Sequence, residues 1–147
     1  FLGHVLSKDG LRPQTCKVQA VREWPELKSE TEVRQFLGLV GFYRKYINNF
    51  ADKARPLNDL LKKEAKVEPG TCSPGTKAYD SFEALKAAVS QAPTLVLPDE
   101  EAAQSGSAPY VIQTDASGFA CGGVLMQDQG KGLQPIAFVS KSFNPAE

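Results

Sequence analysis

The sequence predicts an α+β fold in which a helical region comes first and a three-stranded antiparallel sheet comes last. Apolar side chains recur every three or four residues over residues 33–50 and 82–89, as they do on the buried face of a helix. Residues 110–140 instead contain alternating, β-branched segments separated by glycine-containing turns, which is typical of an antiparallel meander. With 147 residues, of which 41% are hydrophobic and 23% charged, the chain can bury a core and is neither disordered nor fibrous.

The N-terminal part is expected to be a β-hairpin followed by a short helix. Residues 1–6 alternate like a strand, and residues 8–10, Lys-Asp-Gly, are a tight-turn signal. A helix is predicted over residues 14–24, because Pro13 suits a helix start and Pro25 ends the apolar periodicity.

The strongest helix signal covers residues 29–50. Ser29 and Glu32 have the spacing of a capping box at its start. Apolar residues form two stripes along this segment, so the helix must pack against two neighbours. Its less apolar side carries three candidates for phosphate contact, which are Arg34, Arg44 and Lys45.

The middle of the chain is predicted to contain two more helices and a linker. Pro56 suits the first turn of one helix, and the lysines at 62–63 suit its last turn, where cations oppose the helix dipole. Residues 66–77 contain Pro-Gly and Ser-Pro-Gly and are predicted to be a loop. The next helix stops by Pro93.

Two segments connect that helix to the meander. Residues 95–97 are predicted to form a short strand, since three apolar residues end at a proline. Residues 99–108 are acidic and then small and polar, which favours a flexible surface loop.

The meander carries one candidate chemical group, Asp115, at the point where the strand of residues 110–114 is expected to end. A carboxylate is a hard oxygen ligand suited to Mg²⁺, which binds through one or two carboxylates and keeps several waters. A single carboxylate cannot build a two-metal site. Asp-Ala-Ser-Gly is also ordinary turn sequence, in which the aspartate caps its own backbone. The residue pattern alone leaves both roles open.

Charge is balanced over the whole chain and unevenly distributed along it. Residues 1–66 hold 13 of the Lys and Arg residues and 8 of the Asp and Glu residues, whereas residues 67–147 hold 4 and 9. A basic half raises affinity for a polyanion without sequence choice. A solvated helix surface explains the same pattern equally well.

Other residue types exclude several classes of site. Cys16, Cys72 and Cys121 are odd in number and far apart, so we expect reduced structural thiols rather than disulfides or a zinc site. His4 is the only histidine, which excludes a multi-histidine metal centre. No apolar run approaches the roughly 20 residues that cross a bilayer, and no secretory leader is present. We therefore expect an intracellular protein, cytoplasmic or nuclear and not secreted, with no membrane partner.

Three motifs in the last strands carry a family resemblance. They are Thr-Asp-Ala-Ser at 114–117, Gly-Gly-Val-Leu at 122–125 and Pro-Ile-Ala-Phe at 135–138. Together they resemble the opening strands of the ribonuclease H domain in gypsy-like LTR retrotransposon Pol polyproteins. In that family the aspartate of the first motif is the first carboxylate of a two-metal RNA-cleaving site. The resemblance therefore implies a catalytic and metal-binding role for Asp115, with Mg²⁺ as the cofactor of the complete enzyme.

The first half of the chain is similar to the reverse transcriptase of the same family. Phe-Leu-Gly-Leu at 36–39, Tyr-Arg at 43–44 and Pro-Leu at 56–57 match the motifs of its thumb helices in order. The N-terminal segment resembles the hairpin that lies against the primer strand, which implies nucleic-acid contact for Gly3 and His4. A plain hairpin remains equally open. The implied partners are a template-primer duplex, an RNA/DNA hybrid and the remainder of the Pol polyprotein.

The resemblance implies four parts: the end of a palm hairpin (1–12), a thumb (13–66), a connection and linker (67–108) and a truncated N-terminal part of the ribonuclease H domain (109–147). We expect the fragment itself to be inactive, because the other catalytic carboxylates lie outside it. A non-catalytic nucleic-acid-binding remnant and a degenerate pseudogene product remain alternatives. An integrase, which shares the ribonuclease H-like fold, is disfavoured by the thumb motifs.

Overall fold

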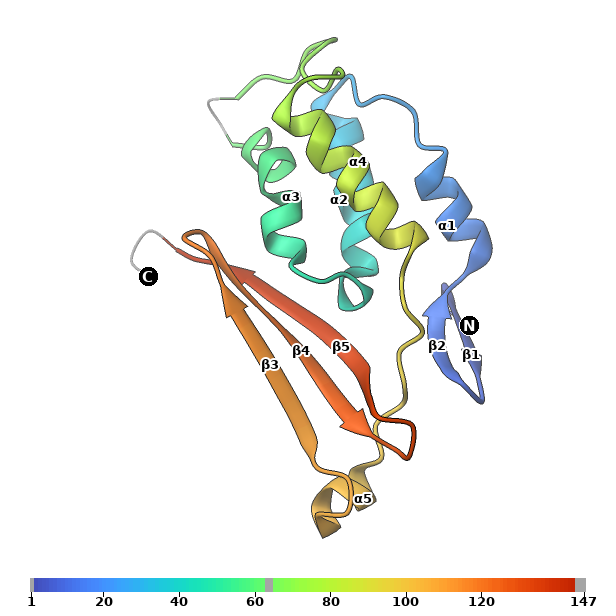
Figure 1. The fold of residues 1–147 in the computed structure, drawn as a ribbon. Helices are drawn as coiled ribbons and strands as arrows, with labels where there is room; N and C mark the ends of the chain where they lie inside the picture. Colours follow the sequence, from blue (N-terminus) through green and yellow to red (C-terminus); the bar gives the residue numbers. More distant parts are fainter. Residues whose placement is uncertain (1, 63–64, 145–147) are drawn as a thin grey trace.

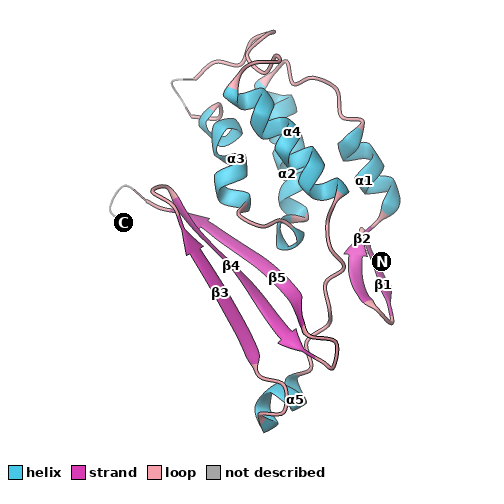
Figure 2. Ribbon diagram, viewed as in Figure 1, coloured by secondary structure: helices cyan, strands magenta, loops and turns pink. Residues whose placement is uncertain are grey.

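A computed structural model describes residues 2–62 and 65–144, and it places a helical lobe beside a three-stranded sheet (Figures 1 and 2). The predicted α+β class is confirmed. The lobe and its N-terminal hairpin consist of β1 (His4–Ser7), β2 (Gly10–Pro13), α1 (Thr15–Arg22), α2 (Glu30–Phe42), α3 (Phe50–Asp59) and α4 (Lys77–Ser90). The sheet consists of β3 (Tyr110–Ala116), β4 (Ala120–Asp128) and β5 (Leu133–Ser142), with the short helix α5 (Glu100–Ser105) at its far end (Figure 1).

The sheet is the predicted antiparallel meander, in the order β3-β4-β5. Asp115 pairs with Gly122, and Gly122 pairs in turn with Ser140. Strand β3 continues one residue past Asp115, because Ala116 still pairs with Cys121 of β4. Asp115 therefore lies inside the end of the strand, where the pairing holds its backbone, and not after it.

The core of the molecule lies between the four long helices. Their capping follows from the sequence: the Ser29 hydroxyl accepts the Glu32 N–H at 3.2 Å, and the Glu32 carboxylate accepts the Lys28 N–H at 2.6 Å. The predicted start of α2 is thus confirmed. The side chains packed between the helices are apolar and fully buried, and they include Val21, Leu27, Val33, Phe36, Leu57 and Leu85.

The single helix predicted to reach Phe50 is wrong. Helix α2 ends at Phe42, a 3-10 turn η1 (Arg44–Tyr46) follows, and Asn49 adopts a left-handed conformation with φ of 54° before α3 begins. The break divides the apolar side chains of this segment between two clusters. Tyr43 and Tyr46 pack with Leu95 in a second cluster, whereas Val40 and Phe50 belong to the main core.

Two further predictions about the middle of the chain need correction. Pro56 lies inside α3 and not in its first turn, because the helix begins at Phe50. Residues 99–108 are not a plain loop. They contain α5, which starts because the Asp99 carboxylate accepts the Ala102 N–H at 2.9 Å. Lys62 follows the end of α3, and Lys63 lies outside the described residues.

The segment after α4 joins the hairpin to the sheet. Leu95 forms a two-way backbone bridge with Leu11 of β2, with both hydrogen bonds at 2.7 Å, and Val96 donates to the Pro135 carbonyl of β5. The predicted strand at 95–97 is therefore only a bridge. Gly10 permits it, because a Cβ at this position would overlap the Leu95 carbonyl oxygen.

The three cysteines differ in their surroundings. Cys72 is fully buried, and burial raises the pKa of its thiol. Cys16 and Cys121 are exposed, so the prediction of structural thiols is wrong for these two. Among the described residues, every helix is too short or too polar to cross a membrane.

Candidate carboxylate site and nucleic-acid interface

Asp115 lies on the sheet face that is turned toward the helical lobe. Residues paired across antiparallel strands point to the same face, so Asp115, Gly122 and Ser140 share it. The lobe contacts this face directly: the Ser140 hydroxyl accepts the Ala51 N–H at 2.9 Å. A Cβ at position 122 would overlap the Asn49 side chain.

The carboxylate of Asp115 is exposed and opens into a hollow of about 190 Å³. The other side chains that line the hollow are mostly neutral and polar, and they include Asn48, Asn49 and Gln113. One carboxylate oxygen also accepts the N–H of Ala116 at 2.9 Å. The backbone-capping role and an exposed carboxylate therefore coexist in this residue.

The donor set of the hollow fits part of a magnesium site. Carboxylate and amide oxygens are the hard ligands that Mg²⁺ prefers, and Asp115 would be the charged one. Residues 2–62 and 65–144 contain no group of three or more His, Cys, Asp or Glu residues that could hold a metal ion. A two-metal site requires several carboxylates, so Asp115 supplies one ligand and not a complete centre.

The structure brings Gly3, His4 and Lys45 together. The Tyr43 hydroxyl donates to the Gly3 carbonyl at 2.7 Å, and His4 Nδ1 lies 2.8 Å from the Tyr46 hydroxyl. The His4 ring also stacks on Phe42, with centroids 5.1 Å apart. Burial and Lys45 lower the pKa of His4, while burial and Tyr43 raise the pKa of Tyr46 to about 12. The hairpin is thus fixed to the lobe by aromatic packing beside a lysine.

The three predicted phosphate contacts have different surroundings. Lys45 lies over the Tyr46 ring at 5.7 Å and has no carboxylate partner in the described part of the chain. Arg34 is exposed and pairs with Glu30 at 2.5 Å. Arg44 is exposed but donates to the Ser140 carbonyl at 2.7 Å, so it holds the lobe to the sheet. Of the three, Lys45 is the one that makes neither a side-chain hydrogen bond nor an ion pair within the described residues.

Sequence reasoning missed two contacts between the lobe and the end of the sheet. The Ser117 hydroxyl donates to the Asp52 carboxylate at 3.1 Å. The Arg55 guanidinium lies 3.4 Å from the centroid of the Phe119 ring. No local signal could have found either contact, because the partners are more than sixty positions apart in the chain.

Comparisons with known proteins agree with this architecture. Residues 75–147 match the family described as an RNase H-like domain found in reverse transcriptase. The whole chain is 40% identical to part of the retrovirus-related Pol polyprotein from transposon 297 of Drosophila melanogaster, and 33% identical to part of that from transposon gypsy of the same species. It spans only 13% and 14% of the lengths of these relatives.

Solved structures show the same fold. The foamy viral protease-reverse transcriptase matches over the whole of this chain with a TM-score of 0.77, both in complex with an RNA/DNA hybrid and in complex with double-stranded DNA. Sequence identity is 21% and 22%, and the chain covers 19% and 29% of those proteins.

The helical lobe and the meander therefore define a reverse-transcriptase segment that leads into an RNase H-like domain. More narrowly, the chain belongs to the Pol polyproteins of gypsy-like retrotransposons, of which it is a fragment.

Proposed function

We propose that this chain is the part of a reverse transcriptase/ribonuclease H polyprotein that grips a nucleic-acid duplex inside the cell. The parent protein synthesises DNA on an RNA template and hydrolyses the RNA strand of RNA/DNA hybrids. The observation that carries this proposal is the grouping of Gly3, His4 and Lys45, from two segments about forty residues apart, on one surface. Solved structures of the same fold contain a hybrid or a DNA duplex, which supports a duplex as the partner.

The chemistry of this surface suits the backbone of a duplex and not its bases. Lys45 would contact a phosphate, while Gly3 keeps the hairpin close to Phe42 and Tyr43, because its φ is +83° and a Cβ there would crowd both side chains. His4 would act as a neutral hydrogen-bonding group, because its lowered pKa disfavours the charged form. Binding through phosphates releases counterions, so affinity would fall steeply with salt and would not depend on base sequence.

Asp115 would serve the nuclease activity of the parent. When bound, Mg²⁺ would activate a water molecule for attack on the RNA strand. The role of Asp115 would be to hold the ion with one carboxylate, while further carboxylates from outside residues 1–147 complete the two-metal centre. The fragment alone would bind duplex but would not turn over.

Hybrid binding tests the first half of this proposal. Fluorescence anisotropy with a labelled, blunt RNA/DNA hybrid would show weaker binding by Lys45→Gln and a salt slope reduced by about one. Lys28→Gln, which changes an equally charged residue elsewhere on the lobe, is the matched control. Equal affinities of Lys45→Gln and wild type would refute duplex binding through this surface.

Cleavage tests the second half. We expect the purified fragment with Mg²⁺ to leave the hybrid intact, and we expect Asp115→Asn to abolish RNA cleavage in the complete polyprotein without weakening hybrid binding. Normal cleavage by that variant would contradict the catalytic role of Asp115. The alternative would then be that the chain is a non-catalytic nucleic-acid-binding remnant in which Asp115 caps a turn. Cleavage by the fragment itself, lost in Asp115→Asn, would contradict its inactivity.

A further inference from the structure

Arg55 on α3 is a charged side chain that the structure leaves without a polar partner. It is exposed, and the Cζ atom of its guanidinium lies over the Phe119 ring, 3.4 Å from the ring centroid. Within residues 2–62 and 65–144 it makes no hydrogen bond and no ion pair. An arginine stacked in this way is held in place while the N–H groups at its edge stay available to an anion.

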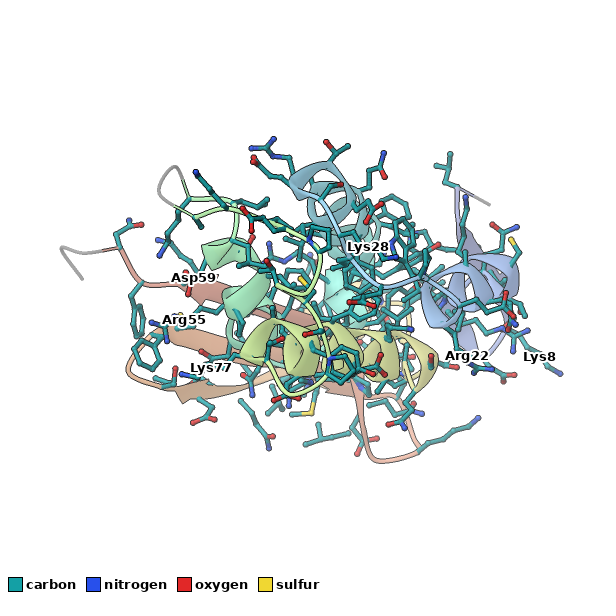
Figure 3. All side chains as sticks on the ribbon, turned by 90° about the horizontal axis from the view of Figure 1, so that it is seen from above. Lys8, Arg22, Lys28, Arg55, Asp59 and Lys77 are labelled. Atoms are coloured by element: carbon teal, nitrogen blue, oxygen red, sulfur yellow. The ribbon has the colours of Figure 1, made fainter. Side chains whose placement is uncertain are left out.

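Arg55 lines two hollows, and the larger of them is mainly lined by cations, amides and aromatic rings. The larger, of about 550 Å³, also contains Lys62, Phe119 and Phe143, and the smaller, of about 370 Å³, also contains Lys77. Asp59 is the one carboxylate that lines either hollow in the described chain, and Lys62 already pairs with it at 2.8 Å. Figure 3 shows Arg55, Asp59 and Lys77 gathered at one end of the molecule, away from Arg22 and Lys8.

Two phenylalanine rings are exposed at the edge of the larger hollow. Phe119 is 54% exposed and Phe143 is 36% exposed. Exposed rings beside a cation without an ion pair, here Arg55, are the combination with which proteins bind single strands, because every base offers an apolar face and every nucleotide a phosphate. Paired bases in a duplex are already stacked, so only an unpaired segment can use these rings.

We propose that the groove formed by Arg55, Lys62, Phe119 and Phe143 holds an unpaired nucleic-acid strand. The rings stack on its bases, and the two cations contact its phosphates. This inference rests on the proposed function and deepens it, since it adds a binding site for a single strand to the duplex surface at Lys45. Neither kind of contact involves the ribose 2′-hydroxyl, so RNA and DNA strands bind alike.

A purely structural role explains the groove less well. The lobe is already fixed to the sheet by the hydrogen bonds of Ser140 with Arg44 and Ala51 and by that of Ser117 with Asp52. The Arg55–Phe119 stack adds a contact but does not account for Phe143 beside it. Lys62 also stands beyond the C-terminal end of α3, where it offsets the partial negative charge that would repel a phosphate.

Binding of single strands by the whole fragment tests the proposal. The probes are labelled oligothymidylate and oligouridylate of about twelve nucleotides, within the usual site size of such grooves. Phe119→Leu, which keeps apolar volume without a ring, and Arg55→Gln should each weaken single-strand binding about tenfold and binding of the blunt hybrid less than about twofold. Tyr110→Leu, which removes an exposed ring on another part of the sheet, should change neither.

The outcomes separate this proposal from the proposed function. If Phe119→Leu and Arg55→Gln bind both oligonucleotides as tightly as wild type does, the proposed groove is overturned. It is also overturned if the two variants lose as much affinity for the hybrid as for the single strands, which would indicate a general phosphate patch. If Lys45→Gln binds the hybrid as tightly as wild type does, while wild type still binds single strands through the groove, only the proposed duplex surface is overturned. If the variants unfold, the groove is tested instead by photocrosslinking the wild-type protein to an oligonucleotide that contains 5-bromouridine. Crosslinks should map to Phe119 or Phe143, and crosslinks confined to other peptides would overturn the groove.

Discussion

Asn49 occupies the space that a Cβ atom at position 122 would need, so a residue of the helical lobe touches the backbone of β4. Gly122 pairs with Asp115, and the contact therefore places the turn before α3 beside the candidate carboxylate. The left-handed conformation of Asn49 is uncommon for a residue with a side chain. The close approach of the lobe to β4 at this point thus requires a glycine at position 122.

Replacing that glycine should loosen the two parts of the molecule. In Gly122→Ala the new methyl group collides with Asn49, and relief of this overpacking should cost about 1–3 kcal/mol in the free energy of unfolding. Gly118→Ala, whose Cβ would meet nothing within 4 Å, should cost clearly less. Urea unfolding of both variants measures the difference, and equal values would contradict the packing of Asn49 on β4.

Ser140 should contribute to the same interface through hydrogen bonds. Its hydroxyl accepts from the Ala51 N–H at the start of α3, so Ser140→Ala leaves that donor without its partner. We expect a loss of about 1 kcal/mol in unfolding free energy, also measured in urea. Ser142→Ala on the same strand is the control, because no hydrogen bond of that exposed hydroxyl occurs within the described residues. An indistinguishable effect of the two changes would argue against the contact.

Gln127 should fix α5 to the end of the sheet. Its fully buried amide accepts the Asp99 N–H at 2.9 Å and donates to the carbonyls of Asp99 and Ala108 at 2.9 and 2.7 Å. Gln127→Met keeps the length of the side chain but removes these bonds, and it should cost about 1–3 kcal/mol. Hydrogen exchange should speed up over residues 99–108. Gln35→Met, an exposed change on α2, should leave that exchange unaltered.

Stability should fall on acidification through His4. The pKa of this imidazole is lowered in the folded state, first by burial and then by Lys45. The imidazole therefore binds a proton more readily in the unfolded chain than in the folded one. The stabilisation that neutral His4 contributes to the free energy of unfolding is complete above its ordinary pKa of about 6.5, and it is lost as the pH falls through the lower pKa of the folded state. Unfolding free energies from about pH 8 to about pH 5 should fall more for wild type than for His4→Gln. Parallel profiles would show that His4 does not titrate as expected.

Much of the fold could be predicted because its signals are local. Turn chemistry and alternation over residues 110–140 were enough for the meander, and Ser29 with Glu32 marked the start of α2. Helix α5 could also have been found, since Asp99 followed by two glutamates is a helix start. The break between α2 and α3 had only a weak local signal, the two asparagines at 48–49, since asparagine is enriched in the left-handed conformation. No glycine or proline lies in residues 42–49, and the chain bends there because Tyr43 and Tyr46 pack on distant Leu95.

The candidate site divides in the same way. The residue pattern proposed Asp115 and Lys45 as candidates, and a family resemblance added Gly3 and His4, but nothing in the sequence indicated that Gly3, His4 and Lys45 lie on one surface. Phosphate contact by Arg44 stays a prediction, and local reasoning could not find its bond to Ser140, 96 positions away.

The sequence by itself determined most of the helices, the three strands of the meander, the position of an acidic residue near the end of the first of these strands, and the polyprotein family to which the chain belongs. The tertiary structure alone decided that Asp115 faces the helical lobe and that Arg55 stacks on Phe119. The physical reason is the separation along the chain over which each kind of interaction acts. Capping, turns and periodicity act between residues a few positions apart, whereas the packing of one lobe on another depends on contacts between side chains that only the folded chain brings together.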